Sequence, residues 1–225
     1  MGLLIPIAVT TYDMDQKLGT HYHQTFNEFL KRVQNEDLAC TTTTTNVKGD
    51  RSKRPKEQTD PDLHLRMVEK RKDGIIVRGA QAHASAALFV NECIVAPTTA
   101  IRTDEREYAV CFTIPVDAKG ITYIMQDGVS QAKRFAEGGV DFGLGELGEL
   151  GGLIILDNVF VPWERVFMCG EAEFTPQLIE GFGTYHRNVP AACKAGWIDV
   201  MIGAAQCIAE YNGVAKVSHI REKIT

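Results

Sequence analysis

His186 and Cys193 carry the side chains of this chain that are best suited to metal chemistry. Imidazole nitrogen and thiolate sulfur are both good ligands for transition metals. If the segment is one continuous helix, seven residues are close to two turns, so both side chains lie on one face, about 10 Å apart along the axis. One metal ion cannot bridge that gap, because its bonds to nitrogen and sulfur are only about 2.0–2.3 Å long. Only a larger cluster, or a helix break at Pro190, brings the pair to one centre.

The same pair also has a plain structural interpretation. Spacing alone favours a loop with a partly buried histidine followed by an ordinary core cysteine, because free cysteine is among the most buried residue types. The other cysteines are scattered through apolar stretches, so we expect reduced thiols rather than a disulfide framework or a CxxC zinc site. Four further histidines show no partner pattern and are expected at the surface or as satisfied core residues: His21, His23, His64 and His219.

A second candidate site is a cluster of positive charge. Five cations fall within nine residues against one acid, Asp50; the cations are Lys48, Arg51, Lys53, Arg54 and Lys56. Such a run is usually a solvated loop. In an acidic protein, however, such a local basic patch also suits a polyanionic ligand, because phosphate oxygens form charge-assisted hydrogen bonds with cations.

Hydroxyl groups form a third set of candidates. Thr41 to Thr45 are five consecutive threonines, whose alternate hydroxyls face one side of a strand. The run is equally typical of simple β-propensity. Ser85 lies where a predicted strand ends, a position at which serine often bonds to its own backbone.

Two periodicities indicate the elements that position these residues. The spacing of Tyr22, Phe26, Phe29, Leu30 and Val33 predicts an amphipathic helix from Thr20 to about Asn35, with Thr20 as its N-cap. The period then changes to that of strands, with an Asp-Gly hairpin turn at residues 71–74. The seven predicted strands are Leu38–Thr45, Leu65–Lys70, Ile75–Ala80, Ala87–Val95, Tyr108–Pro115, Gly120–Gln126 and Leu153–Val161. Strands without intervening helices predict a barrel-like or sandwich-like β-domain.

The last third of the chain predicts a loop and then a long helix. Gly138–Gly152 holds seven glycines in fifteen residues, which favours an irregular loop and suggests a lid. From about Thr175 a helical stripe begins, and it ends near Asn212-Gly213; its members are Cys193, Trp197, Val200, Met201, Ala204, Ala205 and Ile208. Lys216–Thr225 starts another helix. Such a stripe needs partner helices, so we expect a fragment, a split gene product or one half of an obligate assembly.

Composition excludes several classes of protein. The chain has 225 residues, 44% of them apolar, which is typical of a globular protein with a real core. Its net charge of -5 argues against a nucleic-acid binder or a membrane-surface protein. The apolar stretch Gly2–Val9 is short and lacks a basic leader, and no later run has the ~18 residues of a membrane span. We therefore expect a cytoplasmic protein.

Five collinear stretches carry a family resemblance. They are Tyr12-Asp13-Met14-Asp15-Gln16-Lys17, Lys48-Gly49-Asp50-Arg51-Ser52, Asp73-Gly74-Ile75-Ile76-Val77-Arg78-Gly79-Ala80, Asp157-Asn158-Val159-Phe160-Val161-Pro162 and Ala209-Glu210-Tyr211-Asn212-Gly213. The chain thereby resembles the 4-hydroxybutyryl-CoA dehydratase/vinylacetyl-CoA Δ-isomerase family, which is related to the flavin-dependent 4-hydroxyphenylacetate 3-hydroxylases. The similarity covers only the middle of that family's longer polypeptide.

The resemblance implies an α+β fold like that of the acyl-CoA dehydrogenases. A central β-barrel or β-sandwich is flanked by an N-terminal helix and the start of a C-terminal helical bundle, and family members usually form tetramers. We accordingly expect an N-terminal helical segment at 1–37, a β-domain at 38–168 and the start of the helical domain at 169–225. A homo-oligomer, or a companion chain that supplies the missing helices, is the expected assembly.

The resemblance also implies cofactors. In the dehydratases FAD lies beside a [4Fe–4S] cluster held by three cysteines and one histidine. His186 and Cys193 match the histidine and the last cysteine, and the other two ligands would lie upstream of Met1. His186 and Lys194 are the catalytic candidates, the first as a base and the second as a neutraliser of negative charge. The residues expected to bind flavin or phosphate are Thr44, Thr45, Lys48, Asp50, Arg51 and Ser85.

Two departures from the family pattern affect the expected reaction. Pro190 occupies the position of a family tyrosine that assists as a base. Gly151 occupies the position of a family glutamate, and Glu146 and Glu149 lie nearby in the sequence. The first hypothesis is a flavin-dependent dehydratase or isomerase of a short acyl-CoA, whose isomerase half-reaction needs only proton transfers. The second is a flavin-dependent aromatic monooxygenase, and the third is a truncated, non-catalytic paralogue or subunit.

Overall fold

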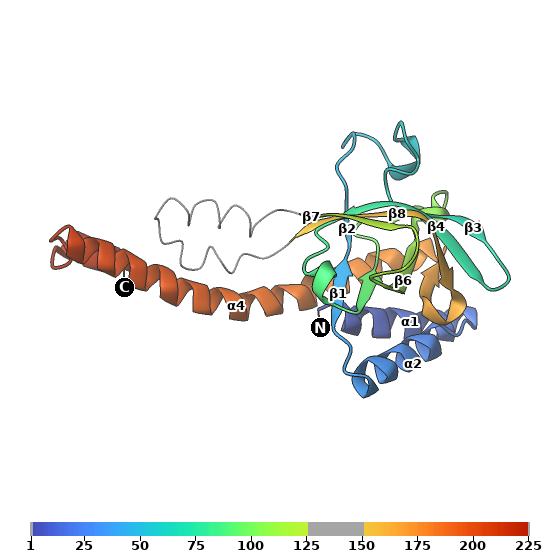
Figure 1. Cartoon of the computed structure of the whole chain (residues 1–225), viewed down its shortest axis with the longest axis horizontal. Coiled ribbons are helices and arrows are strands. Elements are labelled where there is room, and N and C mark those ends of the chain that lie inside the picture. The colour runs from blue at the N-terminus through green and yellow to red at the C-terminus, as the bar shows by residue number, and fades with distance from the viewer. Residues whose placement is uncertain (1, 126–150, 225) are drawn as a thin grey trace. The chain divides into compact units, whose positions relative to one another are not determined.

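The computed structural model describes residues 2–125 and 151–224, which fall into two compact units. One unit comprises Pro6–Glu180, and the other comprises Met1–Ile5 with Gly181–Thr225. The first unit holds both β-sheets (Figure 1). The predicted division at 1–37, 38–168 and 169–225 stays a prediction. No helix among the described residues is long and apolar enough to cross a membrane.

Two helices open the chain, although the sequence predicted only one. They are α1 (Leu4–Leu18) and α2 (Tyr22–Asn35). The buried face of α1 includes Ile7, Thr10, Thr11 and Met14, which have helical spacing. Because two of the four are threonines, an apolar pattern does not reveal the helix.

The predicted cap of α2 is wrong in detail. Thr20 lies before the helix and donates from its hydroxyl to Asp15 Oδ1 at 2.6 Å. The Asp15 carboxylate instead accepts the first backbone N–H groups of α2, those of Tyr22 at 2.9 Å and His23 at 3.0 Å. A residue of α1 therefore caps α2, which also fixes the turn between the two helices.

Nine strands form two open sheets in the described part of the chain. Sheet A has the order β1-β5-β6-β9, and sheet B has the order β2-β4-β8-β7, with β3 paired to β4. The bounds are β1 Cys40–Thr43, β2 Thr45–Asn46, β3 Arg66–Lys70, β4 Gly74–Ala82, β5 Glu92–Val95, β6 Val110–Pro115, β7 Ile121–Met125, β8 Gly152–Pro162 and β9 Val166–Cys169. Short 3₁₀ turns occupy Pro55–Glu57, Ala87–Phe89, Arg106–Tyr108, Trp163–Arg165 and Ala172–Phe174. All pairings are antiparallel except that of β1 with β5.

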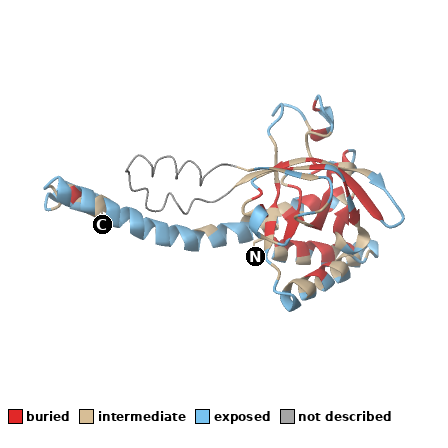
Figure 2. Ribbon diagram, in the orientation of Figure 1, coloured by how far each residue is buried: buried red, intermediate tan, exposed pale blue. Residues whose placement is uncertain are grey.

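Sheet A is covered on both faces. Every residue of β5 and β9 is buried, as are five of the six in β6, which explains why these strands are almost continuously apolar. On one face Phe26 of α2 packs edge-on against Phe167 of β9, with ring centroids 5.2 Å apart. On the other face the core joins residues of both sheets, such as Phe112 of β6 and Val77 of β4. Figure 2 shows this buried interior in the β-sheet unit.

Three strand predictions need correction. The predicted strand Leu38–Thr45 is divided, because β1 joins sheet A and β2 joins sheet B. The first part of Ala87–Val95 is a 3₁₀ turn, and β9 was not predicted. The strands form two open sheets within the described residues, so a closed barrel is not observed. The predicted lid at Gly138–Gly152 lies largely outside those residues.

The long C-terminal helix is continuous, so the helix break at Pro190 that would bring His186 and Cys193 to one centre does not occur. The helix α4 runs from Thr175 to Tyr211 with Pro190 inside it. Its end near Asn212-Gly213 is as predicted: Gly213 has φ 68°, and the Val214 amide donates to the Ala209 carbonyl at 2.9 Å. The last helix, α5 (Ser218–Ile224), follows.

Candidate functional site

His186 and Cys193 lie on one uninterrupted stretch of α4, and both are exposed. Their spacing places them on one face, about 10 Å apart along the axis. The His186 ring stacks on Phe182 one turn earlier, with centroids 5.0 Å apart. Gly2 lies directly against His186, since a Cβ on Gly2 would be only 3.0 Å from the His186 Cα. The N-terminal end of the described chain thus meets the helix at this histidine.

These ligands fit an iron–sulfur cluster only in part. The described residues contain no group of three or more histidine, cysteine or acidic side chains that could hold a metal ion. A [4Fe–4S] cluster normally takes four protein ligands, and His186 with Cys193 supplies two. Lys194 follows Cys193, is exposed, and forms no ion pair in the described part of the chain.

The positive cluster lines a groove in the β-sheet unit. The groove, of about 470 Å³, is formed by residues 45–55 together with Gln58, His64, Thr98 and Thr99, and we call it the cationic groove. It brings four of the predicted cofactor residues together: Thr45, Lys48, Asp50 and Arg51. Thr44 and Ser85 are not part of its lining.

The five cations of the cluster fall into two groups, and all of them except Lys56 line the groove. Arg54 makes two hydrogen bonds from its guanidinium to the fully buried Glu105, at 2.6 and 3.1 Å, and Lys56 pairs with Asp104. Lys53 lies 3.7 Å from Asp50. In contrast, Lys48 and Arg51 form no ion pair with any described residue. Their charges are therefore available to an anionic ligand.

Backbone contacts hold the groove loop in shape. Gln58 is buried, and its amide bonds the backbone at Asp50 and Lys53, with distances of 2.9 to 3.2 Å. The side-chain hydroxyl and the backbone N–H of Ser52 both donate to the Asp50 carboxylate. These hydrogen bonds lower the pKa of Asp50. Gly49 packs closely against two side chains, because a Cβ there would lie 2.4 Å from a methyl carbon of Leu63 and 2.5 Å from Gln58 Oε1, so a larger residue would displace both. The loop is thus ordered before any ligand binds, which reduces the entropy cost of binding.

The threonine run has a structural role as well. As the strand period predicts, Thr41 and Thr43 of β1 are buried on one side. Thr43 donates to the Ala82 carbonyl at 3.1 Å and Thr41 to the Ser85 carbonyl, so their hydroxyls tie sheet A to the end of β4.

Backbone strain marks the segment that holds Ser85. His83 and Ala86 have φ values of 61° and 56°, which is unusual for residues other than glycine. His83, which sequence reasoning did not select, lines an open apolar cavity of about 330 Å³ together with Ile124, Met125 and Gly151. No sequence pattern predicted either feature, because positive φ at these residue types has no reliable signature.

Family models match nearly all of the chain. The model described as the 4-hydroxyphenylacetate 3-hydroxylase N terminal matches residues 3–168, and the C-terminal model of the same family matches residues 175–225.

Individual relatives fall into two kinds. The chain is 44% identical, over 96% of its length, to the 4-hydroxybutyryl-CoA dehydratase/vinylacetyl-CoA-Δ-isomerase of Clostridium aminobutyricum. It matches the structure of an oxygen-tolerant 4-hydroxybutyryl-CoA dehydratase from N. maritimus with a TM-score of 0.91, at 45% identity over 99% of this chain. The oxygenase component of 4-hydroxyphenylacetate 3-monooxygenase, solved in complex with FAD, matches with a TM-score of 0.82 at 25% identity over 99% of this chain.

The chain spans less than half of the length of these relatives. It covers 44% of both dehydratases and 45% of the oxygenase. A glutaryl-coenzyme A dehydrogenase shares the fold alone, with a TM-score of 0.53 at 17% identity over 80% of this chain and 39% of that one. The mixed α/β architecture is thus that of acyl-CoA dehydrogenase-like proteins.

Proposed function

This chain belongs to the 4-hydroxyphenylacetate 3-hydroxylase family, and from that premise we propose that it is part of a flavin-dependent dehydratase/isomerase acting on a short acyl-CoA, such as 4-hydroxybutyryl-CoA or vinylacetyl-CoA. One observation carries the choice within the family. The chain is 45% identical to a dehydratase structure and 25% identical to an oxygenase structure over the same 99% of its length.

The proposed flavin and acyl-CoA site lies in the β-sheet unit. Lys48 and Arg51 supply two positive charges that form no ion pair within residues 2–125 and 151–224, and such charges suit the pyrophosphate of FAD or the phosphates of coenzyme A. Bound FAD would supply one-electron chemistry at a carbon whose hydrogen is otherwise unactivated. Thr45 and Asp50 belong to the same groove, while Thr44 and Ser85 stay candidates for contacts to the flavin itself.

The proposed cluster site is incomplete in this chain. His186 and Cys193 would be two of its four ligands, and a segment that precedes Met1 in a longer polypeptide would supply the rest. Support comes from Gly2, because its contact with His186 means that any preceding residues begin beside that ligand. Lys194 would offset the negative charge of cluster thiolates.

The two departures from the family pattern favour isomerisation over dehydration. Pro190 has no proton-accepting side chain, and loss of a general base typically costs about 10²–10⁴-fold in rate. Gly151 could regain a side chain without a clash, since a Cβ there would meet no described atom within 4 Å. Isomerisation, which needs proton transfers but no loss of hydroxide, is therefore the activity proposed for the assembled protein.

We propose that this chain forms part of a larger subunit. We place the β-sheets as the central sandwich of an acyl-CoA dehydrogenase-like subunit, with 1–37 and 169–225 as its helical flanks. α4 would be the first helix of a bundle completed by further copies or a companion chain. Its exposed apolar side chains, which include Trp197 and Met201, support that assignment.

Absorption spectra of anaerobically purified protein test the proposal. The protein is measured alone and together with any polypeptide that co-purifies with it. Flavin bands plus a broad iron–sulfur shoulder support the dehydratase/isomerase assignment. Flavin bands alone favour the monooxygenase alternative, and the absence of both favours a non-catalytic paralogue or subunit.

A further inference from the structure

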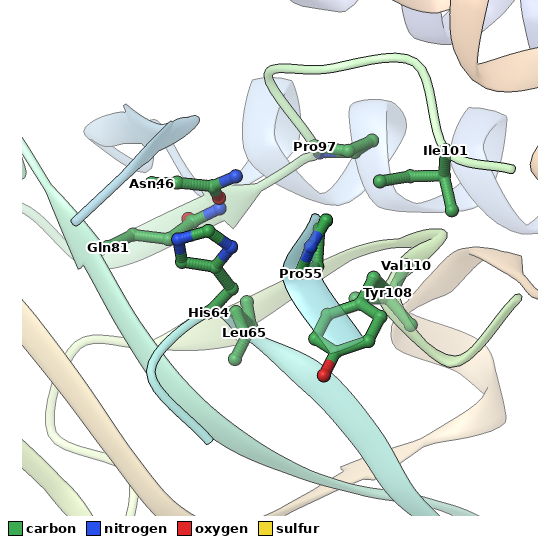
Figure 3. A pocket seen from close by; sticks show the side chains of 9 residues that line it. All are labelled: Asn46, Pro55, His64, Leu65, Gln81, Pro97, Ile101, Tyr108 and Val110. Atoms are coloured by element: carbon green, nitrogen blue, oxygen red, sulfur yellow. The ribbon is translucent and has the colours of Figure 1, made fainter. Parts of the chain in front are cut away.

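An enclosed cavity adjoins the cationic groove. Asn46, Pro55 and His64 line both spaces, and Gln81 lines only the enclosed one. The cavity has a volume of about 10 Å³ for a water-sized probe, which is room for about one water molecule. In Figure 3, Asn46, His64 and Gln81 gather on one side of this cavity and apolar residues such as Val110 occupy the other.

Two polar atoms in the cavity lack partners. Gln81 is 2% exposed, and its Nε2 donates to the Ala96 carbonyl at 3.0 Å, which identifies Oε1 as the free end of the amide. This Oε1 and the His64 Nδ1 are both buried and without a hydrogen bond among the described residues. The backbone of Val47 acts on the His64 ring to raise its pKa, but burial lowers that pKa more strongly. In a neutral ring that carries its proton on Nε2, Nδ1 is a lone-pair acceptor, like Gln81 Oε1.

We propose that one ordered water molecule fills this cavity and donates a hydrogen to each of the two acceptors, His64 Nδ1 and Gln81 Oε1. Two acceptors cannot satisfy one another, and leaving a buried polar group unpaired costs about 1–3 kcal/mol. A water molecule supplies the two donors that are needed, and Asn46, whose amide lies on the same cavity, can donate to its oxygen. Burial, the largest influence on His64, lowers its pKa and so favours the neutral ring that this arrangement needs.

The water makes His64 a positioning residue for the cationic groove. His64, Val47 and Lys48 all line the groove, and Lys48 is one of the two groove cations without an ion pair among the described residues. A His64 ring held by the water therefore supports the start of the groove loop. This consequence for ligand binding rests on the proposed phosphate site, whereas the water itself does not.

Nuclear magnetic resonance of the full chain tests the water directly. Long-range ¹H–¹⁵N spectra at neutral pH, with His64 assigned through His64→Gln, should show a neutral ring protonated at Nε2. A crystal structure should show one water peak within hydrogen-bond distance of both acceptors. A ring protonated on both nitrogens, or an amide turned so that Gln81 bonds His64 directly, overturns the proposal.

Gln81→Met tests the coupling to the groove, with Gln24→Met on the exposed face of α2 as the matched control. Gln81→Met removes one acceptor, so the water peak should disappear. Affinity for inorganic pyrophosphate should fall about two- to tenfold, the effect of one neutral hydrogen bond on an equilibrium constant. Retention of the water in Gln81→Met, or full pyrophosphate affinity with the water lost, contradicts the inference. If Arg51→Ala also leaves pyrophosphate binding unchanged, the proposed phosphate site has failed, and the spectra still decide on the water.

Discussion

At the scale of single residues, Lys48 and Arg51 differ from the cations around them because they have no carboxylate partner among the residues that the structure describes. An unpaired surface cation is well hydrated and binds a phosphate at little further cost. A cation already bonded to a buried acid must first break that bond, which is expensive when the acid is as buried as Glu105. Charge alone therefore does not identify the ligand-binding members of the cluster.

Arg51→Ala should weaken FAD binding by about 1.5–3 kcal/mol, the usual contribution of a hydrogen bond to a charged group. Lys53→Ala, which removes a cation paired with Asp50 in the same loop, is the control and should have a smaller effect. Calorimetric titration measures both. If Arg51→Ala combined with Ser85→Ala leaves FAD affinity unchanged, the cofactor has been assigned to the wrong place.

Cys193→Ala should abolish cluster binding in an assembly that supplies the two missing cysteines, and iron analysis measures it. Cys207→Ala is the matched control, because Cys207 is another exposed cysteine of α4. The lone chain should hold no stable cluster, since two ligands leave two iron sites unprotected. Equal iron content in the two variants would remove Cys193 from the site.

His64 should make folding stability depend on pH just below neutrality. Burial lowers its pKa in the folded state from about 6.5, so the unfolded chain binds more protons between the two values. The contribution of neutral His64 to the free energy of unfolding is complete above about pH 6.5, and it is lost as the pH falls toward the folded-state pKa. Urea unfolding at pH 7.5 and 5.5 measures the difference in the free energy of unfolding between the two pH values. This difference should be smaller in His64→Gln. An unchanged difference in that variant assigns the pH dependence to other groups.

At the scale of elements, the departures from the sequence predictions have identifiable physical causes. α1 was missed because Thr10 and Thr11 belong to its buried face and interrupt the apolar pattern. The division into β1 and β2 was missed because the sequence pattern of a threonine run is the same whether its residues pair in one sheet or in two. The helix α2, the end of α4 and the β3–β4 hairpin depend on local periodicity and were predicted from it. Ion pairs between residues far apart in the sequence, such as those with Asp104 and Glu105, depend on tertiary contacts and were not predicted.

Pro190 is the clearest test at this scale. Proline inside a helix removes a backbone donor and typically costs about 3 kcal/mol, yet α4 continues through it. Pro190→Ala should therefore raise helix content and the thermal midpoint, as circular dichroism measures. Ala191→Gly at the next position is a control that should act in the opposite direction. No gain in Pro190→Ala would mean that neighbouring contacts already compensate for the proline.

A second experiment at Pro190 measures catalysis. Pro190→Tyr and Gly151→Glu are introduced together into the complete assembly. Dehydratase activity should rise if the missing bases limit the reaction, and isomerase activity serves as the internal reference. Similar increases in both activities would indicate a change in stability rather than in chemistry.

At the scale of the whole molecule, α4 exposes more apolar surface than a stable monomer usually does. Trp197, Val200, Met201 and Ile208 are each more than half exposed, and the pale blue course of the helix in Figure 2 shows how continuous this exposure is. Polar residues do not separate them into isolated patches. The longer relatives offer a simple reason, since the chain spans 44% of each dehydratase.

The purified chain should therefore associate. Light scattering should show oligomers or aggregates, and a dye that fluoresces on apolar surfaces should bind. Met201→Glu with Ile208→Lys should reduce both signals, while Lys194→Glu on the same helix is a control that should not. A well-behaved monomer without dye binding would contradict the expectation.

The order of the strands also governs how the chain can fold during its synthesis. β4 pairs with β8 from Gly74 opposite Pro162 to Ala82 opposite Leu153, so the most extensive pairing in sheet B joins residues far apart in the chain. Closing such long loops is slow, because their entropy is lost before the contacts form. The β3–β4 hairpin can form early, but β4, which holds the fully buried Ile75 and Val77, lacks its β8 partner until that strand has left the ribosome. Nascent chains shorter than about Pro162 are accordingly expected to be substrates for chaperones that bind exposed apolar strands.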